Sequence, residues 1–152
     1  MKTIIAIDPG VGGGFCVGKP NSGESPILFA MPESLADIAR AFLDAKSSDT
    51  EVWIEEVPKF TGKNRNESTT AVLFKNVGRL EGIAHTLGMS LNRVLPRTWQ
   101  QSLVIGVRGD TEHAAWKRKL KAKACELYPT LHVTLKTADA LLIWHYSKGG
   151  GR

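Results

Sequence analysis

The first thirty residues constrain the fold most, because their pattern predicts three consecutive strands joined by tight turns. Residues 2–8 are β-branched and apolar and end in an Asp-Pro-Gly sequence, which is typical of a buried strand that enters a turn. Glycines separate this strand from a second apolar segment at 15–17, and a polar turn at 21–24 precedes a third at 27–30. Three short strands with short connections predict an antiparallel meander.

Two further strands and several helices follow the meander. Ser34, with Asp37 three residues later, predicts the cap of a first helix. The other expected elements are strands over 51–57 and 90–95, a helix over 69–87, a short helix from Pro96, a helix over 112–127 capped by Thr111 or Asp110, and a last helix capped by Thr137. We therefore predict an α/β fold with a mixed five-stranded sheet, three antiparallel strands followed by parallel strands, flanked by helices.

The composition excludes several classes of protein. Hydrophobic residues make up 42% of the chain and charged residues 23%, which excludes a disordered or collagen-like chain. Uninterrupted apolar segments fall short of the ~20 residues of a membrane helix, and Cys16 and Cys125 lack a metal-binding spacing. We expect a single domain over 1–152 with a frayed tail at 148–152, free thiols, a cytoplasmic location and no membrane partner.

The charge is distributed unevenly along the chain. Residues 1–56 contain 4 basic and 9 acidic residues, whereas residues 57–152 contain 16 basic and 6 acidic residues. A basic region can bind nucleic-acid phosphates by displacing their counterions, and an acidic region can hold Mg²⁺. A solvated lysine-rich helix face is the alternative explanation, and the charge alone leaves both open.

Three predicted elements carry acidic residues at one end. Asp8 ends the first strand, Glu55 and Glu56 end the fourth, and Asp139 lies in the first turn of the last helix. Each has an ordinary structural explanation: a turn aspartate, solvated strand-end acids, and an acid favoured by the helix dipole. Together, such carboxylates can converge on a divalent ion, and hard oxygen ligands suit Mg²⁺ better than zinc. Carboxylate-held Mg²⁺ beside a basic surface is suited to phosphodiester hydrolysis.

Five segments, in order along the chain, carry a resemblance to a known family. They are IIAIDPG at 4–10, WIEEV at 53–57, PRTW at 96–99, KRKLKAKACELYP at 117–129 and ADALLIWH at 138–145. With these segments the chain resembles the RuvC-type Holliday-junction resolvases of the ribonuclease H-like superfamily. The 117–129 segment is most similar to phage and plant chloroplast members.

The resemblance implies a fold, a reaction and a set of residues. It implies a ribonuclease H-like homodimer that needs Mg²⁺, for which Mn²⁺ can substitute, and that makes paired nicks in a four-way DNA junction. Residue by residue, it implies that Asp8, Glu55 and Asp139 are catalytic metal ligands and that Lys117 stabilises phosphate charge in the transition state. Lys136 stands where many bacterial members have a fourth aspartate, so Glu56 or a cation is the alternative there.

Basic and aromatic residues are the expected DNA contacts. An exposed Phe60 could stack on an unpaired base or act as a wedge at the branch point; its alternative place is against the core. The long helix over 69–87 is the expected dimer surface, with Phe74 and Val77 on its outer side. The predicted DNA-binding residues are Lys59, Phe60, Lys63, Arg65, Arg97, Arg118, Lys121 and Lys123.

We therefore predict a Mg²⁺-dependent, structure-selective endodeoxyribonuclease that resolves Holliday junctions, in the cytoplasm of a bacterial or phage-infected cell. One alternative is a junction-binding protein without catalysis, which a disabling Lys136 would favour. Another is a ribonuclease H-like nuclease for RNA–DNA hybrids or other branched DNA. A sugar- or acyl-kinase-like ATPase shares the strand-Asp-x-Gly opening, but 152 residues are too few for its two lobes and a second phosphate-binding glycine turn is missing.

Overall fold

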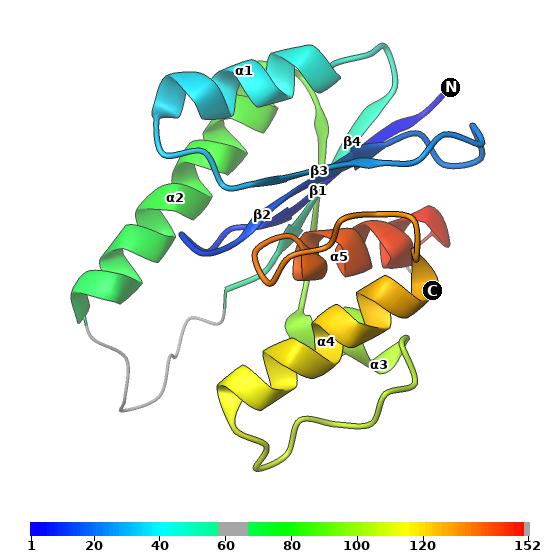
Figure 1. Ribbon diagram of the computed structural model, residues 1–152. Helices are drawn as coiled ribbons and strands as arrows, with labels where there is room; N and C mark the ends of the chain where they lie inside the picture. The colour runs from blue at the N-terminus through cyan, green and yellow to red at the C-terminus, as the bar shows by residue number, and fades with distance from the viewer. Residues whose placement is uncertain (58–66, 151–152) are drawn as a thin grey trace.

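The computed structural model describes residues 1–57 and 67–150, and its centre is a five-stranded sheet with helices on both faces (Figure 1). The elements in chain order are β1 (Thr3–Asp8), β2 (Gly14–Gly18), β3 (Ile27–Ala30), α1 (Leu35–Ala45), β4 (Thr50–Glu55), α2 (Glu67–Thr86), β5 (Ser90–Val94), α3 (Pro96–Gln101), α4 (His113–Leu127) and α5 (Ala138–Lys148). This order confirms the predicted mixed sheet flanked by helices.

The sheet has the order β3-β2-β1-β4-β5, with β1 in the middle. β1 pairs antiparallel with β2, and β2 with β3, as the meander predicts. β1 pairs parallel with β4, and β4 with β5. Since Ile7 is aligned with Ile54, the next residues of the two strands, Asp8 and Glu55, lie at the same edge of the sheet.

Two hydrophobic cores cover the two faces of β1, all six residues of which are buried. Ile5 and Ile7 pack towards α1 and α2, whereas Ile4 and Ala6 pack towards α3, α4 and α5. Figure 1 shows the same division, with α1 and α2 on one side of the sheet and the other three helices opposite. Each fully buried isoleucine contributes about 1.5–3 kcal/mol of hydrophobic stabilisation. Asp8, the last residue of β1, is therefore held by a strand that is packed between two hydrophobic cores.

Helix α5 lies directly under β1 and is buried on almost every side, with Leu141, Leu142 and Ile143 fully enclosed. Its N-cap is Thr137, as predicted, but the hydroxyl does not cap the helix. Instead, the backbone N–H of Thr134 donates to the Thr137 Oγ1 at 3.0 Å. Lys148 is the last residue of α5 and lies over the Tyr128 ring, so the expected frayed tail does not include it.

The predicted end of β4, the predicted cap of α4 and the predicted outward position of Val77 on α2 were wrong. Strand β4 ends at Glu55 and not at 57, and α4 is capped by Glu112, which accepts the Ala114 N–H at 3.2 Å. Thr111 lies one residue before this cap, in a turn where its N–H donates to the Arg108 carbonyl. On α2, Val77 packs against the core and is not on the outer face.

Within residues 1–57 and 67–150, no helix is both long enough and apolar enough to cross a membrane.

Candidate active site

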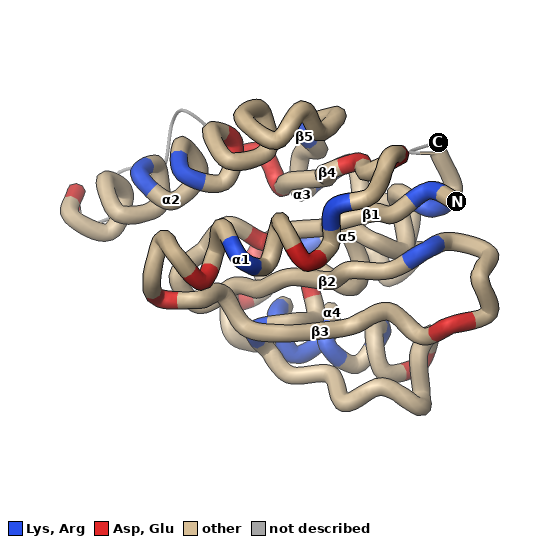
Figure 2. Tube along the Cα trace, turned by 90° about the horizontal axis from the view of Figure 1, so that it is seen from above, with Lys and Arg blue, Asp and Glu red and all other residues tan. Residues whose placement is uncertain are grey.

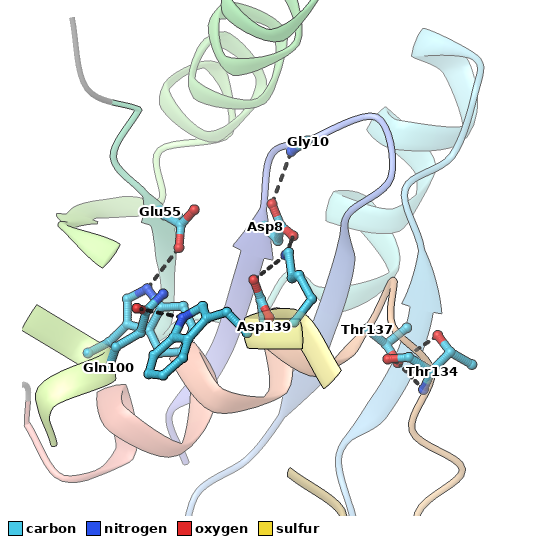
Figure 3. A network of polar contacts seen from close by, with 10 residues as sticks. Asp8, Gly10, Glu55, Gln100, Thr134, Thr137 and Asp139 are labelled. Carbon is cyan, nitrogen blue, oxygen red and sulfur yellow. Dashed lines mark hydrogen bonds and ion pairs between the residues drawn. The ribbon is translucent and has the colours of Figure 1, made fainter. Parts of the chain in front are cut away.

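Three carboxylates from three elements line one cleft of about 1100 Å³. Asp8 ends β1, Glu55 ends the neighbouring β4, and Asp139 lies in the first turn of α5 beneath them. Figure 3 shows Asp8 and Asp139 facing each other, with Glu55 on the adjacent strand. Lys117, from α4, lines the same cleft. The structure thus brings together the four residues that the sequence analysis singled out for catalysis.

The Asp8 carboxylate is held by the turn that follows β1. The backbone N–H of Gly10 donates to the Asp8 Oδ1 at 3.1 Å. A Cβ on Gly13 would lie 2.3 Å from the Asp8 carbonyl oxygen, so only glycine fits there. The turn is also fastened to α2, because the buried Asn76 side chain donates to the Pro9 carbonyl at 2.7 Å. These contacts fix the direction of the Asp8 side chain.

The Lys117 ammonium lies between two of the carboxylates. Its Nζ donates a hydrogen bond to the Asp139 Oδ2 and lies 3.6 Å from the Asp8 Oδ2. Burial alone would lower the pKa of Lys117, but the charges of Asp139, Asp8 and Glu55 outweigh it and raise that pKa. Lys117 therefore carries a positive charge in the middle of the acidic cluster.

Asp139 is 4% exposed, and one of its two carboxylate oxygens lacks a hydrogen-bond partner among the described residues. Its Oδ2 accepts from Lys117, but its buried Oδ1 has no hydrogen-bond partner among the described residues. Burial raises the pKa of Asp139 to about 6, with a further contribution from Asp8, although Lys117 acts in the opposite direction. A buried oxygen without a partner is costly, so this atom is suited to binding a further cation or donor.

Glu55 is positioned by a tryptophan that the sequence analysis did not assign to the site. The indole N–H of the fully buried Trp99 donates to the Glu55 Oε2 at 2.9 Å. Trp116 in turn donates to the Gln100 side chain at 3.2 Å, which ties α4 to α3. Burial, followed by the charges of Asp8 and Asp139, raises the pKa of Glu55 to about 8. Trp99 falls within the PRTW segment, which was the available signal.

The donor chemistry of the cleft fits a hard divalent cation. Within the described ranges, no three His, Cys, Asp or Glu side chains are close enough together to bind a metal ion as they stand. The position between Asp8 and Asp139 is nevertheless taken by a cation, the Lys117 ammonium. The Asp139 Oδ1 has no hydrogen-bond partner among the described residues, so the cleft offers a carboxylate oxygen that an ion could use. Carboxylate oxygens in this number suit Mg²⁺.

Glu56 does not belong to this cluster. It is exposed, and its charge acts on Arg93, whose pKa is raised mainly by Glu81. The alternation of side chains along β4 explains this, because Glu55 and Glu56 leave the strand in opposite directions. Of the two acids, only Glu55 lines the cleft.

The predicted DNA-binding residues fall into three groups. Arg97 and Arg118 line the cleft, as do Arg108 and Lys136, which the sequence analysis did not propose for DNA binding. Figure 2 shows basic positions gathered along α4. Lys121 and Lys123 are half-buried on that helix outside the cleft, and Lys123 pairs with Glu126 at 2.7 Å. The remaining candidates lie outside the described residues: Lys59, Phe60, Lys63 and Arg65.

The raised pKa of Glu55 predicts how stability depends on pH in EDTA. The folded protein holds this proton up to about pH 8, whereas the ordinary pKa is 4.5. The stability from the protonated form is therefore present at low pH and lost as the pH rises through this window. We expect the midpoint temperature of unfolding to decrease as the pH is raised from 6 to 8. Glu55→Gln should remove much of this pH dependence. Circular dichroism melts would measure it, with Glu56→Gln as the control that keeps the wild-type slope; an unchanged slope in Glu55→Gln would contradict the prediction.

Comparisons with known proteins give a fold but no sequence family. No protein-family model matches the chain, and no curated protein is similar to it in sequence. A structure described as Thermus thermophilus RuvC in complex with a Holliday junction substrate has a TM-score of 0.64 at 14% identity, over 99% of this chain and 98% of that chain. A second structure of T. thermophilus RuvC has a TM-score of 0.61 at 15% identity, over 98% and 97%. The resemblance to phage and chloroplast members in particular is not supported by these structures. The chain therefore has the ribonuclease H-like fold of RuvC.

Proposed function

We propose that this chain is a Mg²⁺-dependent, structure-selective endodeoxyribonuclease that resolves four-way DNA junctions by paired nicks. The observation that carries the proposal is the convergence of Asp8, Glu55 and Asp139 in one cleft of a RuvC fold. A solved neighbour of the same fold is RuvC with a Holliday junction substrate, which supports branched DNA as the substrate class.

The proposed chemistry assigns a separate task to each side chain. Asp8, Glu55 and Asp139 would hold Mg²⁺, or Mn²⁺ in its place. When bound, such ions supply positive charge to the phosphate and lower the pKa of water for in-line attack. The Gly10 N–H keeps Asp8 aimed into the cleft, and the Trp99 indole does the same for Glu55. Lys117 would stabilise the charge that develops on the phosphate oxygens.

The wall formed by α3, α4, the loop between them and the segment before α5 would bind the DNA backbone. Arg97, Arg108, Arg118 and Lys136 line the cleft beside the carboxylates. Basic side chains that neutralise phosphates determine affinity and its salt dependence, but not the choice of sequence. The sequence-based candidates beyond the cleft are proposed as further contacts: Lys59, Phe60, Lys63, Arg65, Lys121 and Lys123.

Paired nicks need two active sites, and a homodimer would provide them. On α2, Val72 is 49% exposed and Phe74 is 41% exposed, which leaves apolar surface for a two-fold contact. A two-fold dimer places two identical sites across a junction with the same symmetry.

A junction-binding protein without catalysis is the second candidate. The observation in its favour is the pair of lysines in the cleft: Lys117 lies between two carboxylates, and Lys136 stands where many bacterial resolvases of the RuvC type have a fourth aspartate. Such a protein would bind junctions with or without Mg²⁺ and would not cut them.

The test is cleavage of an end-labelled mobile four-way junction by the purified protein in Mg²⁺ and in EDTA. We expect symmetric nicks in two opposed strands in Mg²⁺ and none in EDTA. Linear duplex and an RNA–DNA hybrid of the same sequence serve as competing substrates. Tight junction binding without cutting in Mg²⁺ or Mn²⁺ would favour the binding protein, and faster cutting of the hybrid would favour a ribonuclease H activity.

A further inference from the structure

The contact of Lys117 with two carboxylates is the feature of the cleft that the proposed nuclease does not explain. A lysine that only stabilises phosphate charge needs to face the DNA. Here the Lys117 ammonium instead donates to the Asp139 Oδ2 and lies 3.6 Å from the Asp8 Oδ2. Asp8 and Asp139 come from different elements and are both largely buried, 8% and 4% exposed. Two carboxylates in such a place repel each other unless a cation lies between them.

Lys117 compensates this pair incompletely. Its single charge faces the two carboxylates of Asp8 and Asp139. The Asp8 Oδ1 has a partner in the Gly10 N–H, but the buried Asp139 Oδ1 has none among the described residues. A divalent ion would bring twice the charge to the same oxygens. The contacts therefore indicate that a divalent ion would replace the Lys117 ammonium at these oxygens and would not bind beside it.

The side chain of Lys117 has room to leave. It is 28% exposed, more than either of its partners, and it lines the open cleft. Its carboxylate partners are fixed by β1 and by the buried start of α5, so the lysine is the mobile member of the contact. Long lysine side chains swing on a flexible four-carbon stem.

We infer that Lys117 is the resident counter-cation of the ion-free site, and that a divalent ion binds to Asp8 and Asp139 by displacing its ammonium into the cleft. This inference rests on the proposed function only in taking these carboxylates as ion ligands. It makes Lys117 a determinant of ion affinity: the free site binds an ion only in the fraction of molecules in which the lysine has withdrawn. The displaced ammonium is then available on the side of the cleft where the DNA backbone would lie.

The first experiment measures ion binding without DNA and without turnover. Mn²⁺ is titrated into the wild type, Lys117→Gln and Lys117→Arg by isothermal calorimetry. Glutamine removes the charge but keeps a polar side chain, whereas arginine keeps the charge. Because a competing state reduces apparent affinity by the fraction of competent molecules, we expect Lys117→Gln to bind Mn²⁺ about tenfold more tightly than the wild type. Lys117→Arg should remain close to the wild type, and so should Lys119→Met, an exposed lysine on the same helix.

The second measurement is thermal unfolding, which also keeps the inference testable if a variant is unstable. In EDTA, Lys117→Gln should unfold at least about 4 °C below the wild type, because two buried carboxylates lose their counter-charge. Saturating Mg²⁺ should raise its midpoint more than that of the wild type and close most of the gap. An equal or smaller Mg²⁺ effect would overturn the inference.

The outcomes separate this inference from the proposed function. If the wild type binds Mn²⁺ and Lys117→Gln binds it equally or more weakly, the displacement is wrong while the nuclease proposal stands. If neither protein binds Mn²⁺ or Mg²⁺, the inference and the metal-dependent nuclease fail together.

Discussion

Asp8→Asn is expected to reduce the rate of junction cleavage in Mg²⁺ by roughly 10³-fold or more, because it removes a charged ligand from the proposed metal site. The substitution should leave the fold intact. Asparagine keeps the side-chain oxygen that accepts the Gly10 N–H. It also relieves the repulsion between Asp8 and the nearby Asp139 and Glu55. The loss would therefore arise in the chemistry and not in folding.

Single-turnover cleavage of a labelled junction, with protein in excess, measures this effect free of product release. Junction binding in EDTA, measured by gel shift, should be unchanged or tighter in Asp8→Asn, since one negative charge has left the cleft that is proposed to bind DNA. Asp44→Asn is the matched control: this residue is exposed on α1, on the opposite face of the sheet, and its substitution should change the rate by less than about twofold. A rate in Asp8→Asn within tenfold of the wild type would remove Asp8 from the proposed site.

Gly13→Ala is expected to damage both stability and cleavage. A Cβ at this position would lie 2.3 Å from the Asp8 carbonyl oxygen and 2.6 Å from its Cγ. The carbonyl cannot retreat easily, because Asp8 is aligned with Gly14 in the β1–β2 ladder. We expect a loss of about 3 kcal/mol in the free energy of unfolding, which lowers the midpoint by roughly 6–12 °C. Where the protein is still folded, displacement of Asp8 should slow cleavage by about 10²-fold.

Gly12→Ala separates this crowding from a general effect of alanine in the turn. No atom lies within 4 Å of a Cβ built on Gly12, so this variant should stay within about 1 kcal/mol of the wild type. Denaturant unfolding and junction cleavage at 20 °C, measured on both variants, provide the comparison. Equal stability of the two alanine variants would show that the turn can open without cost and that it does not position Asp8.

The strands and their acidic ends were predictable because both depend on local sequence. An apolar strand that stops at an aspartate already shows where Asp8 must lie, and parallel pairing brings Glu55 to the same edge. The contacts within the site were not predictable in this way. Trp99 reaches Glu55 across 44 positions of sequence and Lys117 reaches Asp139 across 22, and each contact depends on how the helices pack.

The errors have local causes as well. At the start of α4, the sequence offers neighbouring polar residues as caps, and Glu112 takes the role because the helix begins one residue later than predicted, at His113. Val77 was expected on the outside of α2, but the helix turns this residue towards the core. The spacing of apolar residues shows which face of a helix packs on the core, but it does not show how far around the helix the packed surface extends.

Because α5 is enclosed beneath β1, substitutions are costly around the carboxylates and cheap at the basic positions on the rim of the cleft. Asp8 ends a strand whose six residues are all buried, and Asp139 lies in the buried first turn of α5, so a substitution around either of them disturbs the core. The basic side chains stand on the rim of the cleft, where Arg97, Arg108 and Arg118 are exposed. Exposed positions usually tolerate replacement at little cost in stability. If the proposed function is right, a chain built in this way can acquire a new nucleic-acid preference through its rim while the carboxylate cluster stays unaltered.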